Sequence, residues 1–165
     1  MKDEKEEVSL KVDFDPERAL KGWQRFVQKG ELIYNIPAPI ARSWLRCQGR
    51  KQKAVKLLPN RLNLLPVSNM DLAKTLDICF TKTFQSLPGL VDKNKLLIAV
   101  VGENGGLLAW QGNHQFIINN TLTKGADFRE ESLGTMAVGL ALKEKKAYLT
   151  QGAEHFFSCY HEIAN

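Results

Sequence analysis

Hydrophobic residues recur every three or four positions between residues 15 and 30, which is typical of a helix that buries one face. Asp15 is a suitable N-cap, Pro16 suits the first helical position, and Gly30 can end the helix. The residues that we expect on the packed face are Ala19, Leu20, Trp23, Phe26 and Val27.

A second short helix is predicted to open at Pro39 and to end at Gly49, with Ile40, Trp44 and Cys47 on its apolar face. The first two helices are close in sequence, so we expect them to form a helical hairpin. Pro59 and Pro66 favour a loop or linker after it.

The clearest helical pattern lies between residues 68 and 87, before the helix-breaking pair Pro88 and Gly89. Ser68 is a natural N-cap, and Asp71 three residues later completes a near capping box. The positions with helical spacing are Leu72, Ala73, Leu76, Cys79, Phe80, Thr83, Phe84 and Leu87.

The remaining third of the chain mixes strand and helix patterns. Residues 95–112 show two apolar runs around a Gly/Asn-rich turn, which predicts a β-hairpin, while 114–122 fits either strand or helix. We expect a helix over 134–146, a short strand over 147–150 and a last helix over 153–164. These elements predict an α+β fold with helices on an antiparallel sheet.

Length and composition fit a folded domain of ordinary character. The chain has 165 residues, of which 44% are hydrophobic and 25% charged. We expect a frayed segment over 1–15, the helical hairpin with its basic linker over 16–65, and an α+β domain over 66–165. The three separated cysteines indicate reduced thiols, and the charged start and short apolar runs indicate neither a signal peptide nor a membrane span. We therefore expect a cytoplasmic protein.

Charge is unevenly distributed although the net charge is only +5. Residues 32–70 contain no acidic residue, and their basic residues are Arg42, Arg46, Arg50, Lys51, Lys53, Lys56 and Arg61. This window suits contact with DNA or an acidic protein through Arg42, Arg46 and Arg50. A solvated charged face is the simpler interpretation, because these arginines lie opposite Trp44 and no recognition helix is evident. We expect weak, salt-sensitive DNA binding.

Two groups of residues raise the possibility of catalysis or metal binding near the end of the chain. Glu154 and His155 are candidate acid and base, but adjacent helical residues point in different directions and no nucleophile elbow accompanies them. His155, Cys159 and Glu162 have helical spacing suited to zinc, with His161 nearby, but no Cys-x-x-Cys is present. Structural roles are the simpler interpretation, so we expect neither an enzyme nor a metal site.

A glycine-rich segment, GENGG at 102–106, follows the first predicted strand. It lacks the Lys-Ser/Thr pair of a phosphate-binding loop and a helix to receive the phosphate. A hairpin turn explains it, and we expect no cofactor.

Several segments resemble, in order, the N-terminal sensory region of the AcoR/DhaR-like sigma-54-dependent transcriptional activators, regulators of acetoin and glycerol operons. They are GWQRFVQKG at 22–30, Pro39 with Ile40, SWLRC at 43–47, EESLGTMAVGLAL at 130–142 and GAEHF at 152–156. The resemblance covers about residues 18–162. It implies a GAF-type domain that senses a small effector or a partner protein and controls attached output domains.

In such a domain the segment 131–157 forms a pocket wall. We expect Gly134 and Gly139 to let a helix approach the sheet, Thr135 to cap that helix, and Val138, Leu140 and Leu142 to fill the core. The expected ligand-binding residues are Trp110, Phe128, Gly134, Thr135, Met136 and His155.

The chain departs from the family pattern in two places. Met136 occupies the position of an Asn, and the strands that follow Gly-Ala-Glu-His in the family lie beyond Asn165. The resemblance therefore implies a sheet without its C-terminal strands, as in a sensor segment on its own. Unpaired strand edges favour pairing with another chain, so we expect self-association, most simply as a dimer.

Overall fold

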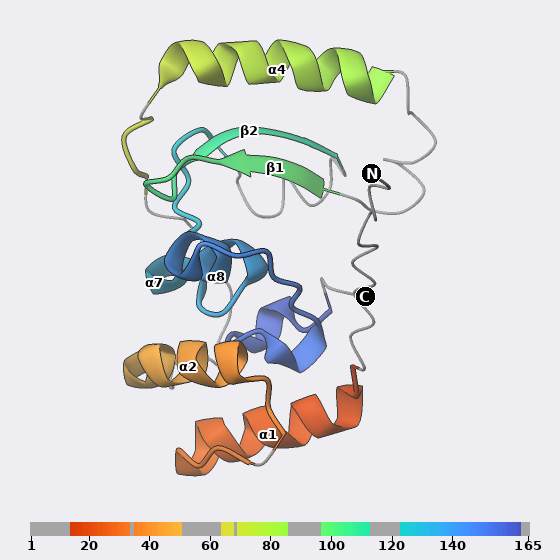
Figure 1. Cartoon of the computed structure of the whole chain (residues 1–165), viewed down its shortest axis with the longest axis vertical. Helices are drawn as coiled ribbons and strands as arrows, with labels where there is room; N and C mark the ends of the chain where they lie inside the picture. The colour runs from red at the N-terminus through yellow and green to blue at the C-terminus, as the bar shows by residue number, and fades with distance from the viewer. Residues whose placement is uncertain are drawn as a thin grey trace, which may run out of the picture.

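A computed structural model describes residues 14–33, 35–50, 64–67, 69–85, 97–112 and 123–162 (Figure 1). Within them, five α-helices accompany one antiparallel sheet of two strands, which confirms the predicted α+β class. The helices are α1 (Pro16–Lys29), α2 (Ala38–Cys47), α4 (Met70–Gln85), α7 (Glu130–Leu133) and α8 (Ala137–Glu144), the strands are β1 (Leu97–Val101) and β2 (Leu107–Gly112), and three 3₁₀ turns are η1 (Gln48–Arg50), η2 (Gly152–Glu154) and η3 (Ser158–Tyr160).

The elements are stacked along the longest axis of the molecule. Figure 1 shows α4 covering the outer face of the sheet, with α7 and α8 between the sheet and the hairpin formed by α1 and α2. No helix among the described residues is long and apolar enough to cross a membrane.

Helix α1 begins and ends as the sequence predicts. The Asp15 carboxylate accepts a hydrogen bond from the backbone N–H of Arg18 at 3.0 Å, and Gly30 ends the helix with a left-handed φ of 78°. Trp23 and Phe26 are buried. Leu20, expected on the same face, is 41% exposed. That expectation was wrong because the buried face of α1, which contains Ala19, Trp23 and Phe26, is narrower than the set of apolar residues in the helix.

Helix α2 buries Ile40, Trp44 and Cys47, as predicted. Two indole N–H groups attach the hairpin to the C-terminal segment. Trp23 Nε1 donates to the Phe156 carbonyl at 2.8 Å, and Trp44 Nε1 donates to the Glu154 carbonyl at 2.9 Å. Because buried indoles need acceptors, these bonds fix how the hairpin sits on residues 152–160.

Strands β1 and β2 form the predicted hairpin. They pair antiparallel from Leu97–Gly112 to Val101–Leu107, with an irregularity between Val100 and Val101. The base of β2 also bonds residues 125–127, where the Leu107 N–H donates to the Ala126 carbonyl at 2.9 Å. The ambiguous segment 114–122 lies outside the described residues.

Helix α4 is capped one residue later than expected. The Asn69 side-chain oxygen accepts from the Leu72 N–H at 2.8 Å, whereas Ser68 lies outside the described residues. Ala73 is buried, but Leu72 is 44% and Ile78 57% exposed. The apolar pattern is therefore broader than the face that packs on β2.

The single helix expected over 134–146 is interrupted. Helix α7 ends at Gly134, whose φ is 69°, and α8 begins after Met136. The prediction that Thr135 caps the helix was wrong, because the first N–H of α8, that of Ala137, donates to the Thr150 hydroxyl at 3.1 Å.

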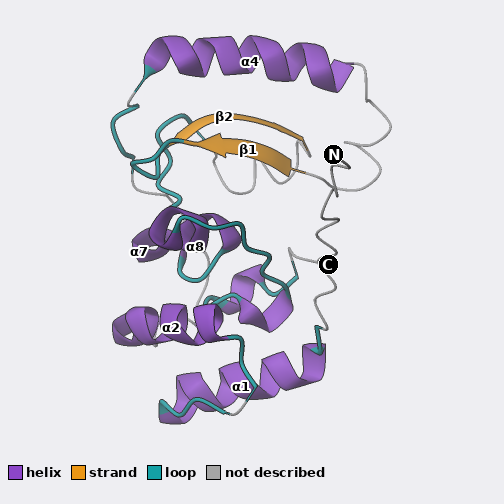
Figure 2. Ribbon diagram, viewed as in Figure 1, coloured by secondary structure: helices purple, strands orange, loops and turns teal. Residues whose placement is uncertain are grey.

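Neither the strand expected over 147–150 nor the helix over 153–164 forms. Figure 2 draws 147–150 as loop. There the Tyr148 hydroxyl donates to Glu144 in α8, and the Thr150 hydroxyl accepts from the backbone N–H of Ala137 in α8. The described part of 153–164 contains only η3 and the end of η2. Both patterns were short, and tertiary hydrogen bonds outweighed their local preferences.

Two glycines allow close approach, but not to the sheet as expected. A Cβ on Gly139 would lie 3.2 Å from the backbone N of Glu130 in α7. A Cβ on Gly134 would lie 3.1 Å from the Phe156 Cβ. These contacts bring α8, α7 and residues 156–157 together.

Candidate functional site

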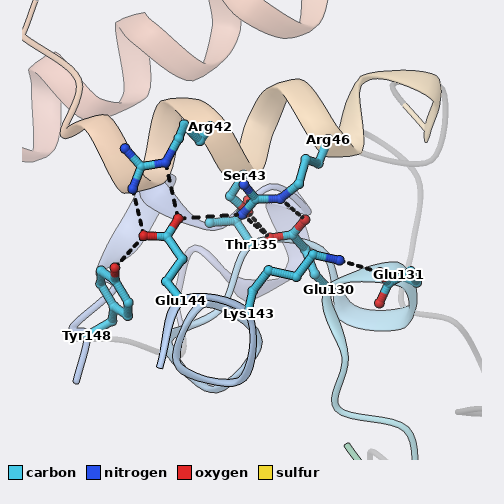
Figure 3. A network of polar contacts seen from close by, with 9 residues as sticks. All are labelled: Arg42, Ser43, Arg46, Glu130, Glu131, Thr135, Lys143, Glu144 and Tyr148. Carbon is cyan, nitrogen blue, oxygen red and sulfur yellow. Dashed lines mark hydrogen bonds and ion pairs between the residues drawn. The ribbon is translucent and has the colours of Figure 1, made fainter. Parts of the chain in front are cut away.

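Among the described residues, the richest cluster of buried polar groups lies where α2 meets α7 and the turn before α8. We call it the junction and define it by Ser43, Arg46, Glu130, Thr135 and His155. Figure 3 shows the first four of these, with further charged side chains and Tyr148 beside them.

The centre of the junction is the Glu130 carboxylate, only 3% exposed at the start of α7. Arg46 holds it with two bonds, 2.7 Å from Nε to Oε1 and 2.8 Å from a terminal nitrogen to Oε2. Ser43 adds a third bond of 2.8 Å to Oε2. Burying a carboxylate is costly unless it is paired and hydrogen-bonded, and here both conditions hold. The hydrogen bond to Glu130 raises the pKa of Arg46.

Ser43 and Thr135 extend this network across the interface. Their hydroxyl oxygens are 2.7 Å apart, and both side chains are fully buried. A carboxylate can only accept, so Ser43 donates its proton to Glu130. The Thr135 hydroxyl must then donate to the Ser43 oxygen. The bond directions are therefore fixed from Thr135 to Glu130.

A second group of polar side chains lies beside this centre. Arg42 holds Glu144 at the end of α8 with bonds of 3.2 Å and 2.6 Å, and Arg46 lies 4.0 Å from the same carboxylate. Tyr148 also donates to Glu144. Hydrogen bonds from Arg42 and Tyr148 lower the pKa of Glu144, and the same bond raises the pKa of Tyr148.

His155 completes the junction from the opposite side. Its ring is 3% exposed, and Nδ1 lies 3.1 Å from the Thr135 carbonyl oxygen. A carbonyl only accepts, so Nδ1 carries the proton and Nε2 presents a lone pair. Nε2 is buried and has no hydrogen-bond partner among the described residues. Burial lowers the pKa of His155 to about 4, outweighing the bond to Thr135, and the imidazole is neutral near pH 7.

Tyr160 and His161 lie beside His155. The Tyr160 ring meets it edge-on with centroids 6.2 Å apart, and burial raises the pKa of Tyr160. His161 donates from Nε2 to the His155 carbonyl at 3.1 Å and packs edge-on against Trp23. Burial also lowers the pKa of His161.

The structure brings some of the expected ligand-binding residues together. Thr135 and His155 are in contact, and Gly134 lies against Phe156. Met136 is half-buried at the start of α8. Phe128 is buried in the core and Trp110 packs against that core from β2. That these residues line one cavity remains a prediction.

The other candidate chemistries find different surroundings. The Glu154 carboxylate accepts from the Gln151 N–H at 2.9 Å and burial raises its pKa, whereas His155 bonds Thr135. The two side chains thus serve different partners. No group of three metal-ligating side chains gathers within the described ranges, and burial raises the pKa of the Cys159 thiol.

The basic window is only partly described. Arg42 and Arg46 are solvent-exposed, as expected, but both are ion-paired with carboxylates of this chain. The Arg50 side chain and residues 51–61 lie outside the described parts. Any DNA or acidic protein bound through Arg42 or Arg46 would compete with these internal pairs.

Sequence reasoning missed Ser43, Glu130, Glu144 and Tyr148. A signal for the first two was present, because a serine beside a core tryptophan and a glutamate beside an apolar helix both break the apolar pattern. The segments SWLRC, EESLGT and GAEHF, far apart in the chain, contribute Ser43, Glu130 with Thr135, and His155. The segments that were singled out separately therefore meet at one place.

The chain is similar to the acetoin dehydrogenase operon transcriptional activator AcoR of Bacillus subtilis (strain 168). The two are 25% identical over 150 residues, which cover 86% of this chain and 24% of the activator. The chain thus spans about a quarter of the length of that protein. No protein-family model matches the chain, and no solved structure matches it. The distant relationship to a transcriptional activator supports a regulatory role in general.

Proposed function

We propose that this chain is a GAF-type sensory domain of a bacterial transcription regulator, which binds a small effector and biases attached output domains. The observation that carries the proposal is the similarity to the activator, which runs along 86% of the chain but only 24% of the activator. A relationship of that extent suits one regulatory part of a larger protein. Such a domain acts in the cytoplasm.

The junction supplies a physical route from a ligand to the N-terminal hairpin. His155 bonds the backbone of Thr135, the Thr135 hydroxyl bonds Ser43 in α2, and Ser43 shares Glu130 with Arg46. A ligand that moves His155 or Thr135 changes hydrogen bonds that hold α2. Binding can then favour one of two positions of α2, provided that the ligand binds the two states with different affinity.

The charges of the junction indicate what kind of effector suits it. Arg46 and Glu130 pair with each other, and Arg42 pairs with Glu144. His155 is neutral near pH 7 because burial lowers its pKa to about 4. A small neutral molecule therefore fits better than an ion. The proposal assigns no catalytic step to Glu154 or His155.

Binding of small neutral metabolites to the purified chain tests the proposal. The similar activator is named for an acetoin dehydrogenase operon, so acetoin is the first compound to measure, alongside short diols and polyols. Ligand-observed NMR should detect saturable binding of at least one compound, and His155→Phe should change its affinity. If no compound of this class binds at millimolar concentration, the sensory proposal fails for small neutral effectors.

A further inference from the structure

The Nε2 atom of His155 stands out among the buried polar groups. The side chains of Ser43, Glu130 and Thr135 are hydrogen-bonded within the junction. Asp127, Thr150 and Glu154 are also buried and hydrogen-bonded. Within the described ranges, His155 Nε2 is the one fully buried side-chain nitrogen or oxygen without a partner.

An unpaired acceptor of this kind has no structural use of its own. Leaving a buried polar atom unsatisfied costs free energy, and folded proteins avoid it. A phenylalanine would avoid that cost at Nε2 but would lose the hydrogen bond that Nδ1 donates to the Thr135 carbonyl. The bond from Nδ1 to the Thr135 carbonyl also orients the ring and fixes the lone pair on Nε2. The geometry is that of an acceptor held ready for a donor.

We propose that Nε2 of His155 accepts a hydrogen bond from a hydroxyl or N–H group of the effector. This inference rests on the proposed function and names the group that recognises the ligand. The effector must then carry a donor and no net charge, because the charged side chains of the junction are paired with one another. A metal ion is the less suitable occupant, since no second and third ligand gather with His155 among the described residues.

The role of the donor can be tested with three compounds that share one carbon skeleton. Acetoin and butane-2,3-diol carry hydroxyl donors, whereas butane-2,3-dione carries only acceptors. A site that expects a donor rejects an analogue lacking it, because its own polar atom is then left unpaired. We expect the dione to bind the wild-type chain at least about tenfold more weakly than the diol or acetoin.

The variant His155→Phe should abolish this preference, so that the three compounds bind with similar, weak affinity. His161→Phe is the matched control, because it replaces a neighbouring histidine that bonds the backbone carbonyl of His155 and packs edge-on against Trp23, and it leaves both ring nitrogens of His155 in place. It should keep the preference. A preference that survives in His155→Phe, or equal binding of all three compounds to the wild type, would overturn the inference while leaving the sensory proposal in place.

The ¹⁵N spectrum of the imidazole rings provides a reading that does not depend on any variant. In the free protein, His155 should show a protonated Nδ1 and a bare Nε2, and acetoin should shift the Nε2 resonance toward the hydrogen-bonded position. A free protein whose Nε2 already accepts a hydrogen bond would refute the inference without touching the proposed function. Binding of zinc that His155→Phe removes would also refute it. No binding of any of the three compounds counts against both proposals.

Discussion

Ser43 and Thr135 are 92 residues apart in the chain, yet their hydroxyl oxygens lie 2.7 Å apart in a fully buried position. One hydroxyl belongs to α2 and the other to the turn that leads into α8. The same pair connects Glu130 on one side with the backbone contact to His155 on the other. A small number of buried polar contacts therefore joins the N-terminal hairpin to the C-terminal segment, beside the apolar core that the two share.

Replacing Glu130 should destabilise the fold more than replacing the acid next to it. Glu130→Gln leaves the Arg46 guanidinium without its main anionic partner and removes charge from two hydrogen bonds. We expect a loss of about 2–3 kcal/mol in the free energy of unfolding. Glu131→Gln, at a 58% exposed side chain, should change it by less than about 0.5 kcal/mol. Urea unfolding measures both, and equal effects would contradict the account.

The hydroxyl pair should show energetic coupling. Ser43→Ala and Thr135→Val each remove one hydroxyl, and each should cost about 1–2 kcal/mol because a buried partner is left unsatisfied. The double variant should cost less than the sum by about 1 kcal/mol, since both ends of the bond are then gone. Unfolding free energies of the four proteins complete the cycle. Strict additivity would show that the two side chains do not interact.

Stability should fall as the pH drops from about 6.5 to about 4. Burial lowers the pKa of His155 from 6.5 to about 4 in the folded chain. The unfolded chain then takes up a proton first, so the stability contributed by neutral His155 is complete above pH 6.5 and is lost below it. The loss amounts to about 3 kcal/mol, at about 1.4 kcal/mol per pH unit.

His155→Phe should flatten this part of the pH profile. His161, whose pKa burial also lowers, contributes in the same direction and stays in the variant. The difference between the two profiles therefore isolates His155. Thermal or urea unfolding at closely spaced pH values provides the measurement. Profiles that remain parallel between pH 6.5 and 4 would show that His155 is not a buried neutral imidazole.

The sequence predicted the elements whose patterns are long and locally capped. Helix α1 has its cap, its proline and its terminal glycine in the expected places, and the β1–β2 hairpin follows two apolar runs around a tight turn. The short patterns after residue 145 failed because they depend on tertiary contacts. Thr150 bonds the start of α8, and two indoles hold the carbonyls of Glu154 and Phe156.

The candidate site was predictable only in part. Thr135 and His155 were expected to share a site, and they are in contact. Glu130 breaks the apolar pattern, but that break could not show that the acid is buried, because a glutamate beside an apolar helix is usually a solvated residue. Only the fold shows that Arg46 and Ser43 approach it from α2. Long-range pairing of this kind leaves no periodic signal in the sequence.

We still expect this chain to self-associate, but through a different surface. Residues 147–150 form no strand, so an unpaired edge there no longer supports it. Helix α4 instead exposes Met70 (51%), Leu72 (44%) and Ile78 (57%). We expect a dimer at micromolar concentration in sedimentation velocity, weakened by Ile78→Glu because it places a charge among these side chains. Gln24→Glu, at an exposed polar position on α1, is the control, and a wild-type monomer would contradict the prediction.

Hydrogen exchange of α2 with and without effector is the most direct test of the central claim, that occupancy near His155 is transmitted to the N-terminal hairpin. In the wild type, saturating acetoin should slow amide exchange both in residues 150–160 and in residues 38–47. In Thr135→Val, which keeps the backbone bond to His155 but loses the hydroxyl bond to Ser43, only residues 150–160 should respond. A wild-type response confined to 150–160, or no response in either segment, would contradict the account.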